Sequence, residues 1–187
     1  MIYAETARLI LRAPKPRDVP RLVELLNNLA VARWLTIVPH PYTTQHAEEF
    51  FARMYEAIDK GAPEYFLMER KNDAVQIGAV GLHPPREPHP VGKLMIGYWL
   101  GQPYWKQGFM SEAVIPVIRH AFARPEVDIL VADADTENNA SNQVLRKAEF
   151  SCVGTMPRRE AALLRDNRDV MCWRLTRQEF ERQGNKP

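Results

Sequence analysis

The sequence predicts an α/β fold in which helices cover both faces of a mixed sheet of about seven strands. Strand-like and helical segments alternate along the chain, and twice a strand passes through a short polar turn directly into a helix. The first passage is IGYWLGQPYWKQGFMSEA at 96–113, and the second joins DILVADAD to ENNASNQVLRKAEF within 128–150. Two such passages in succession indicate parallel strands with a crevice between them, where α/β sheets commonly bind ligands.

The chain begins with a short strand and a helix. The strand is expected at 8–12, and Asp18 then caps a helix that ends near Leu29. The leucines that share one face of this helix are Leu22, Leu25, Leu26 and Leu29. The proline-rich segment TIVPHPYTT connects it to the next helix.

A second helix and a hairpin follow. Thr44 is the expected N-cap of a helix that reaches about Lys60 and ends at Gly61. EYFLMER and AVQIGAVGLH flank a Lys-Asn-Asp turn at 71–73, and this pattern is typical of a β-hairpin.

The second half of the chain predicts alternating strands and helices after an exposed proline-rich loop at 84–93. The expected elements are a strand at 94–100, a helix from about 108 to 123, a strand at 128–135, a helix from about 140 to 148, and strands near 150–156 and 169–175. Pro116 is expected to kink the first of these helices. Thr176 and Glu179 form a capping box for a short last helix. Without an internal repeat or linker, residues 1–187 are expected to form one domain with a core at about 6–176.

Composition narrows the class of protein. Hydrophobic residues make up 45% of the 187 residues and charged residues 26%, as in ordinary globular domains. The net charge of +2 indicates neither a nucleic-acid nor a membrane partner, and no apolar run could span a bilayer. The N-terminus lacks the pattern of a signal peptide, and Cys152 and Cys172 are expected to be buried, reduced thiols. These features predict a cytoplasmic protein. No His/Cys cluster has metal-ligand spacing, so no metal is expected.

The turn around Gly108 has a chemical consequence. The first N–H groups of the following helix have no acceptor within it, and they converge at the positive end of the helix dipole. A phosphate group suits that position.

Three motifs carry a resemblance to a known family. They are TxRLxLR at 6–12, Tyr98-Trp99-Leu100 leading through Tyr104-Trp105 to Ser111-Glu112-Ala113, and the pattern formed by Asn138, Ser141, Val144, Leu145, Lys147 and Phe150. With these motifs the chain resembles the GCN5-related N-acetyltransferases, the GNAT superfamily. It looks closest to the branch that acetylates ribosomal-protein N-termini and related amines. The resemblance covers roughly residues 6–176.

The resemblance implies acetyl-CoA as the donor, without a metal, and a primary amine of a protein N-terminus or small molecule as the acceptor. The loop that it assigns to the pyrophosphate comprises Trp105, Lys106, Gln107, Gly108, Phe109 and Met110, with Ser111 opening the helix. The backbone of Trp99, Leu100 and Gly101 would pair with the pantetheine arm like an extra strand. Asn138 would hold the cofactor, and Ser141 would lie near its sulfur.

The chain departs from the family pattern at four positions. Lys106 and Met110 stand where many relatives have glycine or alanine, and their side chains are expected to narrow the loop. Glu149 replaces a glycine, so the preceding helix is expected to end differently. Leu145 occupies the place of the tyrosine that serves as general acid in many members of the wider family.

The chemistry of acetyl transfer makes deprotonation of the acceptor the main demand, because an alkyl ammonium has a pKa near ~10 and an α-amino group near ~8. Glu112, Glu160 and Asp169 are the candidate bases. A thiolate with a pKa near ~8.5 needs at most a weak acid such as Ser141.

Alternatives to an active enzyme are a catalytically inactive acyl-CoA-binding or regulatory module and a protein-interaction domain without a cofactor. The segments expected to contact the acceptor, about 31–42 and 158–168, name no ligand. Exposed strand edges near the C-terminus are compatible with a homodimer.

Overall fold

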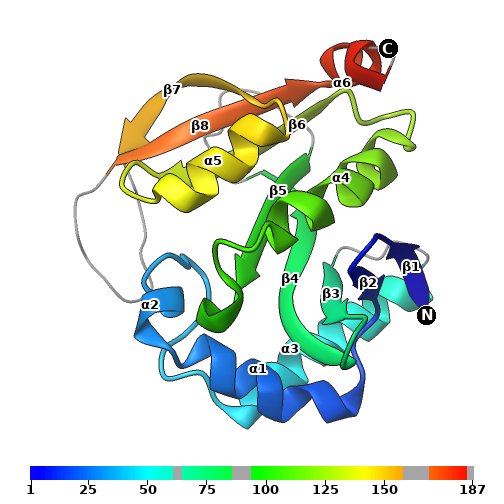
Figure 1. Ribbon diagram of the computed structural model, residues 1–187, viewed down its shortest axis with the longest axis vertical. Helices are drawn as coiled ribbons and strands as arrows, with labels where there is room; N and C mark the ends of the chain where they lie inside the picture. Colours follow the sequence, from blue (N-terminus) through cyan, green and yellow to red (C-terminus); the bar gives the residue numbers. More distant parts are fainter. Residues whose placement is uncertain (61–64, 86–93, 158–168, 185–187) are drawn as a thin grey trace. The chain divides into compact units, whose positions relative to one another are not determined.

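A computed structural model describes residues 1–60, 65–85, 94–157 and 169–184 of the chain. Across this part, the strands form one mixed eight-stranded sheet in the order β1-β2-β3-β4-β5-β6-β8-β7 (Figure 1). The strands are β1 (Ile2–Glu5), β2 (Leu9–Arg12), β3 (Tyr65–Arg70), β4 (Val75–His83), β5 (Leu94–Leu100), β6 (Ile129–Asp135), β7 (Ser151–Pro157) and β8 (Asp169–Thr176). The predicted α/β class with a mixed sheet is confirmed.

Six α-helices and two 3₁₀ turns connect the described strands. They are η1 (Pro16–Asp18), α1 (Val19–Leu26), α2 (Leu29–Ala32), α3 (Thr44–Asp59), η2 (Gln102–Tyr104), α4 (Phe109–Phe122), α5 (Asn139–Lys147) and α6 (Arg177–Gly184). From β5 onward, the elements agree with the predicted ones within about two residues. Pro116 lies inside α4 as expected, and a kink there stays a prediction. The predicted loops at 84–93 and 158–168 lie largely or wholly outside the described residues.

The sequence missed β1, the first strand of the sheet. Its four residues, IYAE, show no alternation of apolar and polar side chains, and none of them is fully buried. The strand is defined by antiparallel pairing with β2, in which Glu5 faces Ile10 and the Ala13 N–H donates to the Met1 carbonyl at 3.0 Å. Only the tertiary pairing reveals such a strand.

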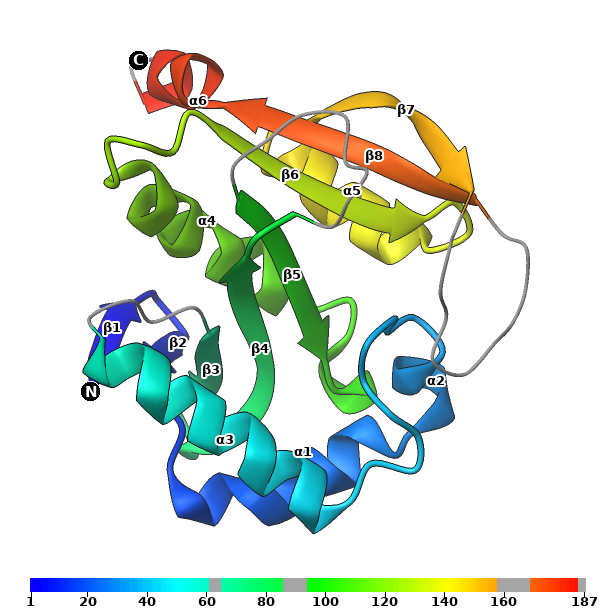
Figure 2. The ribbon, with the colours of Figure 1, turned by 180° about the vertical axis from the view of Figure 1, so that it is seen from behind.

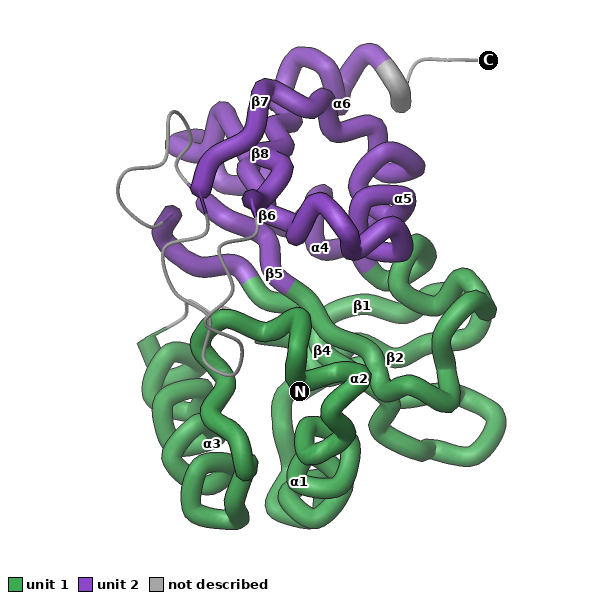
Figure 3. The backbone as a smooth tube through the Cα atoms, turned by 90° about the vertical axis from the view of Figure 1, so that its left-hand side faces the viewer, with its two compact units in different colours: residues 1–81, 98–113, 159–166 green, residues 82–97, 114–158, 167–187 purple. Residues whose placement is uncertain are grey.

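Backbone contacts divide the chain into two compact units (Figure 3). Unit 1 contains residues 1–81 and 98–113, and unit 2 contains 82–97 and most of the chain from 114 onward. The boundaries pass through β4, β5 and α4. The single domain expected from the sequence stays a prediction.

Unit 1 is built on one apolar core. Helices α1 and α3 lie side by side against β3 and β4, as Figures 1 and 2 show. The buried core residues are Leu22, Leu26, Val31, Tyr42, Ala47, Phe51, Met54, Leu67 and Ala79. Leu22, Leu25 and Leu26 are buried as predicted, whereas Leu29 is 61% exposed. The prediction for Leu29 was wrong because α1 ends at Leu26.

A buried charge network joins β2, β3 and the start of α1. The Arg12 guanidinium, 1% exposed, donates to both carboxylate oxygens of Asp18 at 2.7 Å and to Glu69 Oε2 at 2.7 Å. Burial alone would lower the pKa of Arg12, but the hydrogen bonds and charges of Asp18 and Glu69 raise it. Arg17 reaches Glu69 from the rim at 3.2 Å. The three buried charged groups are therefore paired with one another.

The same network corrects the predicted cap of the first helix. Asp18 occupies the N-cap position of α1, but its side chain makes no capping hydrogen bond to that helix. It accepts instead from Arg12 and from the Lys15 N–H at 2.8 Å, closing the 3₁₀ turn. The ionic partner outcompetes the local cap because a charge-assisted bidentate bond is the stronger interaction.

The starts of α2 and α3 also differ from the predicted helix boundaries. Asn28 begins the separate helix α2 and accepts from the Ala30 N–H at 2.9 Å. Thr43, rather than Thr44, caps α3 through the His46 N–H at 3.3 Å. Gly61, the expected stop of α3, lies outside the described residues.

Unit 2 is organised around β6. This strand pairs in parallel with β5, at Leu94 and Met95, and antiparallel with β8. Helix α5 lies along these strands (Figure 1), and the buried Trp173 indole of β8 donates to Asn142 of α5 at 3.0 Å. The predicted parallel pair is confirmed. The capping box of α6 is also confirmed, because the Thr176 N–H donates to Glu179 at 2.8 Å and the Glu179 N–H to Thr176 Oγ1 at 3.2 Å.

The end of α5 differs from the expectation. Glu149 adopts the left-handed conformation with φ 62°, which glycine would adopt more easily. Its N–H donates to the Arg146 carbonyl and the Phe150 N–H to the Leu145 carbonyl, both at 3.0 Å. These two bonds form a Schellman motif. The helix therefore ends in the usual way, because the surrounding bonds hold a non-glycine residue in the left-handed region.

We predict that Arg12→Met lowers the free energy of unfolding by about 3–5 kcal/mol, because Asp18 and Glu69 stay buried without their counter-charge. Urea unfolding of both proteins measures the effect. Arg17→Met is the matched control; its side chain is 61% exposed, and its removal should cost at most about 1 kcal/mol. Equal effects of the two substitutions would contradict the assigned role of Arg12.

Candidate functional site

The connection from β5 to α4 has a backbone suited to an anion. After Gly101, the 3₁₀ turn η2 leads into Trp105, and then Lys106 and Gly108 adopt left-handed conformations with φ 60° and φ 80°. Gly108 directly precedes the right-handed residues of α4, and a left-handed residue next to a right-handed one makes successive N–H groups converge into a concave site for anions. The first N–H groups of α4 lie directly behind this loop and have no acceptor within the helix. Backbone donors and the helix dipole thus favour a phosphate here.

Several side chains hold the loop in this shape. The Trp105 indole donates to the Leu100 carbonyl at 2.6 Å, and Gln107 Nε2 donates to the Pro103 carbonyl at 2.9 Å. The buried Tyr104 hydroxyl accepts from Arg21 at 2.5 Å. Asn28, the cap of α2, also reaches the loop and donates to Gln102 Oε1 at 2.6 Å. The conformation is therefore specified by contacts from α1, α2 and the loop itself.

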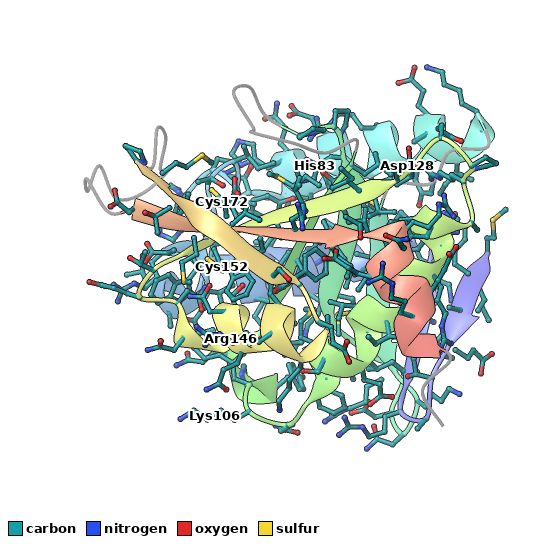
Figure 4. The ribbon with its side chains drawn as sticks, turned by 90° about the horizontal axis from the view of Figure 1, so that it is seen from above. His83, Lys106, Asp128, Arg146, Cys152 and Cys172 are labelled. Atoms are coloured by element: carbon teal, nitrogen blue, oxygen red, sulfur yellow. The ribbon has the colours of Figure 1, made fainter. Side chains whose placement is uncertain are left out.

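The two unusual side chains of the loop are accommodated. Met110 is buried, 6% exposed. Lys106 is exposed, and Figure 4 shows its side chain pointing outward from the turn. Neither side chain needs to occupy the concave face formed by the backbone amides. The left-handed conformation at Lys106 costs about 1–2 kcal/mol, because Cβ crowds the following carbonyl oxygen.

A carboxylate in the first turn of α4 joins the loop to the N-terminal motif TxRLxLR. Glu112 accepts from the Thr6 hydroxyl, from the Arg8 N–H at 2.8 Å and from Arg8 Nε at 2.7 Å, and its Oε2 forms an ion pair with Arg8 Nη2 at 2.7 Å. Burial alone would raise the pKa of Glu112, but the hydrogen bonds from Thr6 and Arg8 and the charge of Arg8 lower it. Glu112 is therefore ionised and its oxygens are occupied.

This arrangement favours an orienting role for Glu112 over a role as general base. A general base works best with a pKa near the operating pH and an oxygen open to the proton it removes. Glu112 has a lowered pKa, three hydrogen bonds and an ion pair with Arg8 inside unit 1. Sequence reasoning assigned no role to Thr6 or Arg8, although the N-terminal motif that contains them was the available signal.

The end of β5 presents its two edges differently. The Gly101 N–H donates to the Ile77 carbonyl of β4 at 2.9 Å. A Cβ at Gly78 of β4 would lie 2.5 Å from the Trp99 carbonyl oxygen, so Trp99 also faces β4. Alternate residues of a strand direct their backbone groups to opposite edges, so Leu100 faces the other edge, where Trp105 binds its carbonyl. The Leu100 N–H therefore points away from β4.

The second strand-to-helix turn lies in unit 2. Asn138 caps α5, and its side chain accepts from the Ser141 N–H at 3.1 Å. Ser141 is half-buried in the first turn. Asn142, which sequence reasoning missed, is buried and donates to the Asp135 carbonyl at 3.0 Å. Through its second bond, to Trp173, Asn142 anchors the turn to both β6 and β8.

The remaining candidate bases are less informative. Glu160 lies outside the described residues. Asp169 is exposed at the start of β8, and its backbone carbonyl accepts from the Thr136 N–H at 3.1 Å. In the described ranges no group of three His, Cys, Asp or Glu residues could hold a metal ion. None of the described helices is long and apolar enough to cross a membrane.

The cysteines are both free thiols, as predicted. Cys172 is buried in β8, and burial, together with Asp133 and Cys152, raises its pKa to about 11, which makes it a poor nucleophile. Cys152 is exposed, contrary to the expectation, because β7 is the edge strand of the sheet and its side chains lie mostly at the surface (Figure 4).

Comparison with known proteins gives a consistent result. Residues 8–151 match the protein family described as the acetyltransferase (GNAT) domain. The chain is 28% identical over 154 residues to YoaA of Bacillus subtilis (strain 168), an uncharacterized N-acetyltransferase, covering 81% of this chain and 84% of that protein.

Solved structures share the fold. RimL, a ribosomal L7/L12 alpha-N-protein acetyltransferase in complex with coenzyme A, is 23% identical with a TM-score of 0.78, covering 96% of this chain and 99% of that chain. RimJ of Mycobacterium smegmatis in complex with CoA-disulfide is 17% identical with a TM-score of 0.74, covering 91% and 83% of the two chains.

We predict that Glu112→Gln lowers the free energy of unfolding at pH 7 by about 1–3 kcal/mol, since charge-assisted hydrogen bonds to Arg8 and Thr6 are weakened. Because the folded-state pKa of Glu112 is lowered, the contribution is complete above its ordinary value of 4.5 and is lost as pH falls through the folded-state pKa. The difference between wild type and Glu112→Gln should therefore shrink below about pH 4.

Urea unfolding at pH 7, 5, 4 and 3 measures this difference. Glu48→Gln, at an exposed position of α3, is the matched control and should change stability by at most about 0.5 kcal/mol at pH 7. A wild-type advantage over Glu112→Gln that stays constant over the whole pH range would show that the carboxylate charge is irrelevant.

Proposed function

The chain belongs to the GNAT family of acetyltransferase domains, and we propose that it transfers an acetyl group from acetyl-CoA to the primary amine of a protein N-terminus or a small molecule. The observation that carries the proposal is the loop before α4, where the left-handed Lys106 and Gly108 precede a helix N-terminus. Backbone amides in this conformation match a diphosphate. The N-acetyltransferase name of the Bacillus relative and the coenzyme A bound to RimL support the same donor.

The residues present fit acetyl-CoA as a co-substrate. The diphosphate would be held by the backbone of Trp105 to Met110 with Ser111, where Gly108 leaves the surface of the loop without a side chain. The pantetheine arm would lie along the edge of β5 that faces away from β4, at Leu100. Asn138 and Ser141, at the N-terminus of α5, would hold the thioester end.

In the proposed reaction, the acceptor nitrogen attacks the thioester carbonyl carbon, the new C–N bond forms, and the C–S bond breaks. A backbone N–H near the end of β5 would stabilise the developing oxyanion, a role worth about 3 kcal/mol. Ser141 would donate a proton to the leaving sulfur. Glu160 is the proposed base, acting directly or through a water, because Glu112 is engaged by Arg8.

The acceptor and the setting are also proposals. RimL acts on the N-terminus of a ribosomal protein, and a peptide amine is therefore the first acceptor to test. The free thiols of Cys152 and Cys172 are compatible with a reducing cytoplasm. The exposed edge strand β7 offers an edge for a homodimer.

Thermal unfolding with and without acetyl-CoA tests donor binding. At about 100-fold over the dissociation constant, the ligand should add about 2.7 kcal/mol to the free energy of unfolding. Release of CoA thiol is then followed across peptides, polyamines, aminoglycosides and amino acids. The absence of any ligand-induced shift would overturn the proposal, and a shift without thiol release on any amine would favour the inactive acyl-CoA-binding module.

We predict that Ser141→Ala lowers kcat by about tenfold while leaving the affinity for acetyl-CoA within about twofold, because a thiolate can leave without a strong acid. Alanine keeps the backbone N–H that Asn138 binds, so the cap of α5 is retained. Steady-state kinetics and calorimetry separate the two quantities. An unchanged kcat would exclude Ser141 as the proton donor.

A further inference from the structure

Arg8 contacts Gln107, Phe109 and Glu112, where the loop meets α4, yet the proposed function gives it no role. Its Nη1 donates to the Gln107 carbonyl at 2.9 Å, and its Nε and Nη2 bind Glu112 at 2.7 Å. Its guanidinium carbon lies 4.4 Å from the centre of the Phe109 ring. One planar side chain from the segment before β2 thus binds the last turn of the loop and the first turn of α4.

The bond to Gln107 determines the direction of the next amide. A trans peptide is planar, and its C=O and N–H groups point in opposite directions. Since Arg8 holds the Gln107 carbonyl, the N–H of Gly108 in the same peptide points away from the guanidinium. We assign this N–H to the phosphate site proposed for the loop, since Gly108 is left-handed and directly precedes α4. Rotation of the peptide would exchange this donor for a carbonyl oxygen, which repels an anion.

The bond to Glu112 controls the local charge. A carboxylate in the first turn of α4 lies close to the site proposed for a dianionic group, where its charge would oppose binding. Arg8 offsets this charge with two side-chain bonds and one backbone bond.

We propose that Arg8 is a positioning residue for the diphosphate of acetyl-CoA, holding the Gln107–Gly108 peptide and neutralising Glu112 so that the loop amides face the ligand. This inference rests on the proposed function. It concerns the diphosphate alone, and therefore separates two donors: acetyl-CoA carries the diphosphate, whereas S-acetylpantetheine carries the same thioester without it.

The experiment compares the two donors in wild type and Arg8→Met. The kcat/KM for acetyl-CoA should fall about tenfold to hundredfold, the cost of a lost charged hydrogen bond. The kcat/KM for S-acetylpantetheine should stay within about twofold of wild type. If S-acetylpantetheine is turned over too slowly for kcat/KM to be measured, its inhibition constant against acetyl-CoA is compared between the two proteins instead. Equal losses for both donors, or no loss for either, would overturn the inference.

Three further proteins keep the test decisive. Lys71→Met removes a cation next to the Arg8 backbone that pairs with Glu5 and does not contact the loop, so both donors should behave as in wild type. Arg8→Lys keeps the charge without the planar fork; it should show an intermediate, acetyl-CoA-selective loss, and it decides the question if Arg8→Met does not fold. In the Glu112→Gln background, Arg8→Met should cost acetyl-CoA affinity less than in wild type, because no carboxylate needs neutralising.

The wild-type measurement distinguishes the two levels of the proposal. Failure of wild type to bind acetyl-CoA would overturn the proposed function together with the role of Arg8. Binding by wild type with equal donor dependence in Arg8→Met would leave the proposed function intact and overturn the role of Arg8 alone.

Discussion

The first N–H groups of α4 find no acceptor in their own helix, and the conformation of residues 105–108 decides where they point. Lys106 and Gly108 are both left-handed, and Gly108 directly precedes α4, a backbone geometry that favours converging N–H groups. Only glycine adopts this conformation without strain. At Lys106 the chain accepts the strain, and the surrounding bonds of Trp105 and Gln107 hold the turn in place. This backbone geometry is what makes the loop before α4 suited to an anion.

Two arginines of the N-terminal segment support that geometry from different sides. Arg12 is buried and binds Asp18 and Glu69, which ties β2 to β3 and to the start of α1. Arg8 is half-exposed and binds Gln107 and Glu112, which ties the segment before β2 to the loop and to α4. The buried network of Arg12, Asp18 and Glu69 holds the N-terminal segment in place. Arg8, in the same segment, then binds the loop and α4. In the sequence, the motif TxRLxLR at 6–12 served only to indicate the family; in the structure, its two arginines hold the segment in place.

The contrast between Glu112 and a catalytic carboxylate follows from the same contacts. Three hydrogen bonds and the neighbouring Arg8 guanidinium stabilise the charged form of Glu112, so it has a structural role and takes no proton near neutral pH. The base of the proposed reaction would therefore come from elsewhere, and we propose Glu160 for it.

In unit 2, two asparagines hold α5 in place. Asn138 caps the helix, and Asn142 binds it to β6 and β8.

From β5 onward, the order of strands and helices, the parallel pair β5–β6 and the glycine turn that leads into α4 were readable from the sequence. Each depends on neighbours in the chain: apolar periodicity, a glycine at a turn, an asparagine before a helix. The tertiary structure alone decided the rest. Arg12 and Glu69 are 57 residues apart, and Arg8 and Glu112 are 104 apart. These distant pairings occupy Glu112 and tie β2 to β3. Asp18 leaves its helix cap for Arg12, only six residues away, because a charge-assisted bidentate bond outweighs the local capping preference.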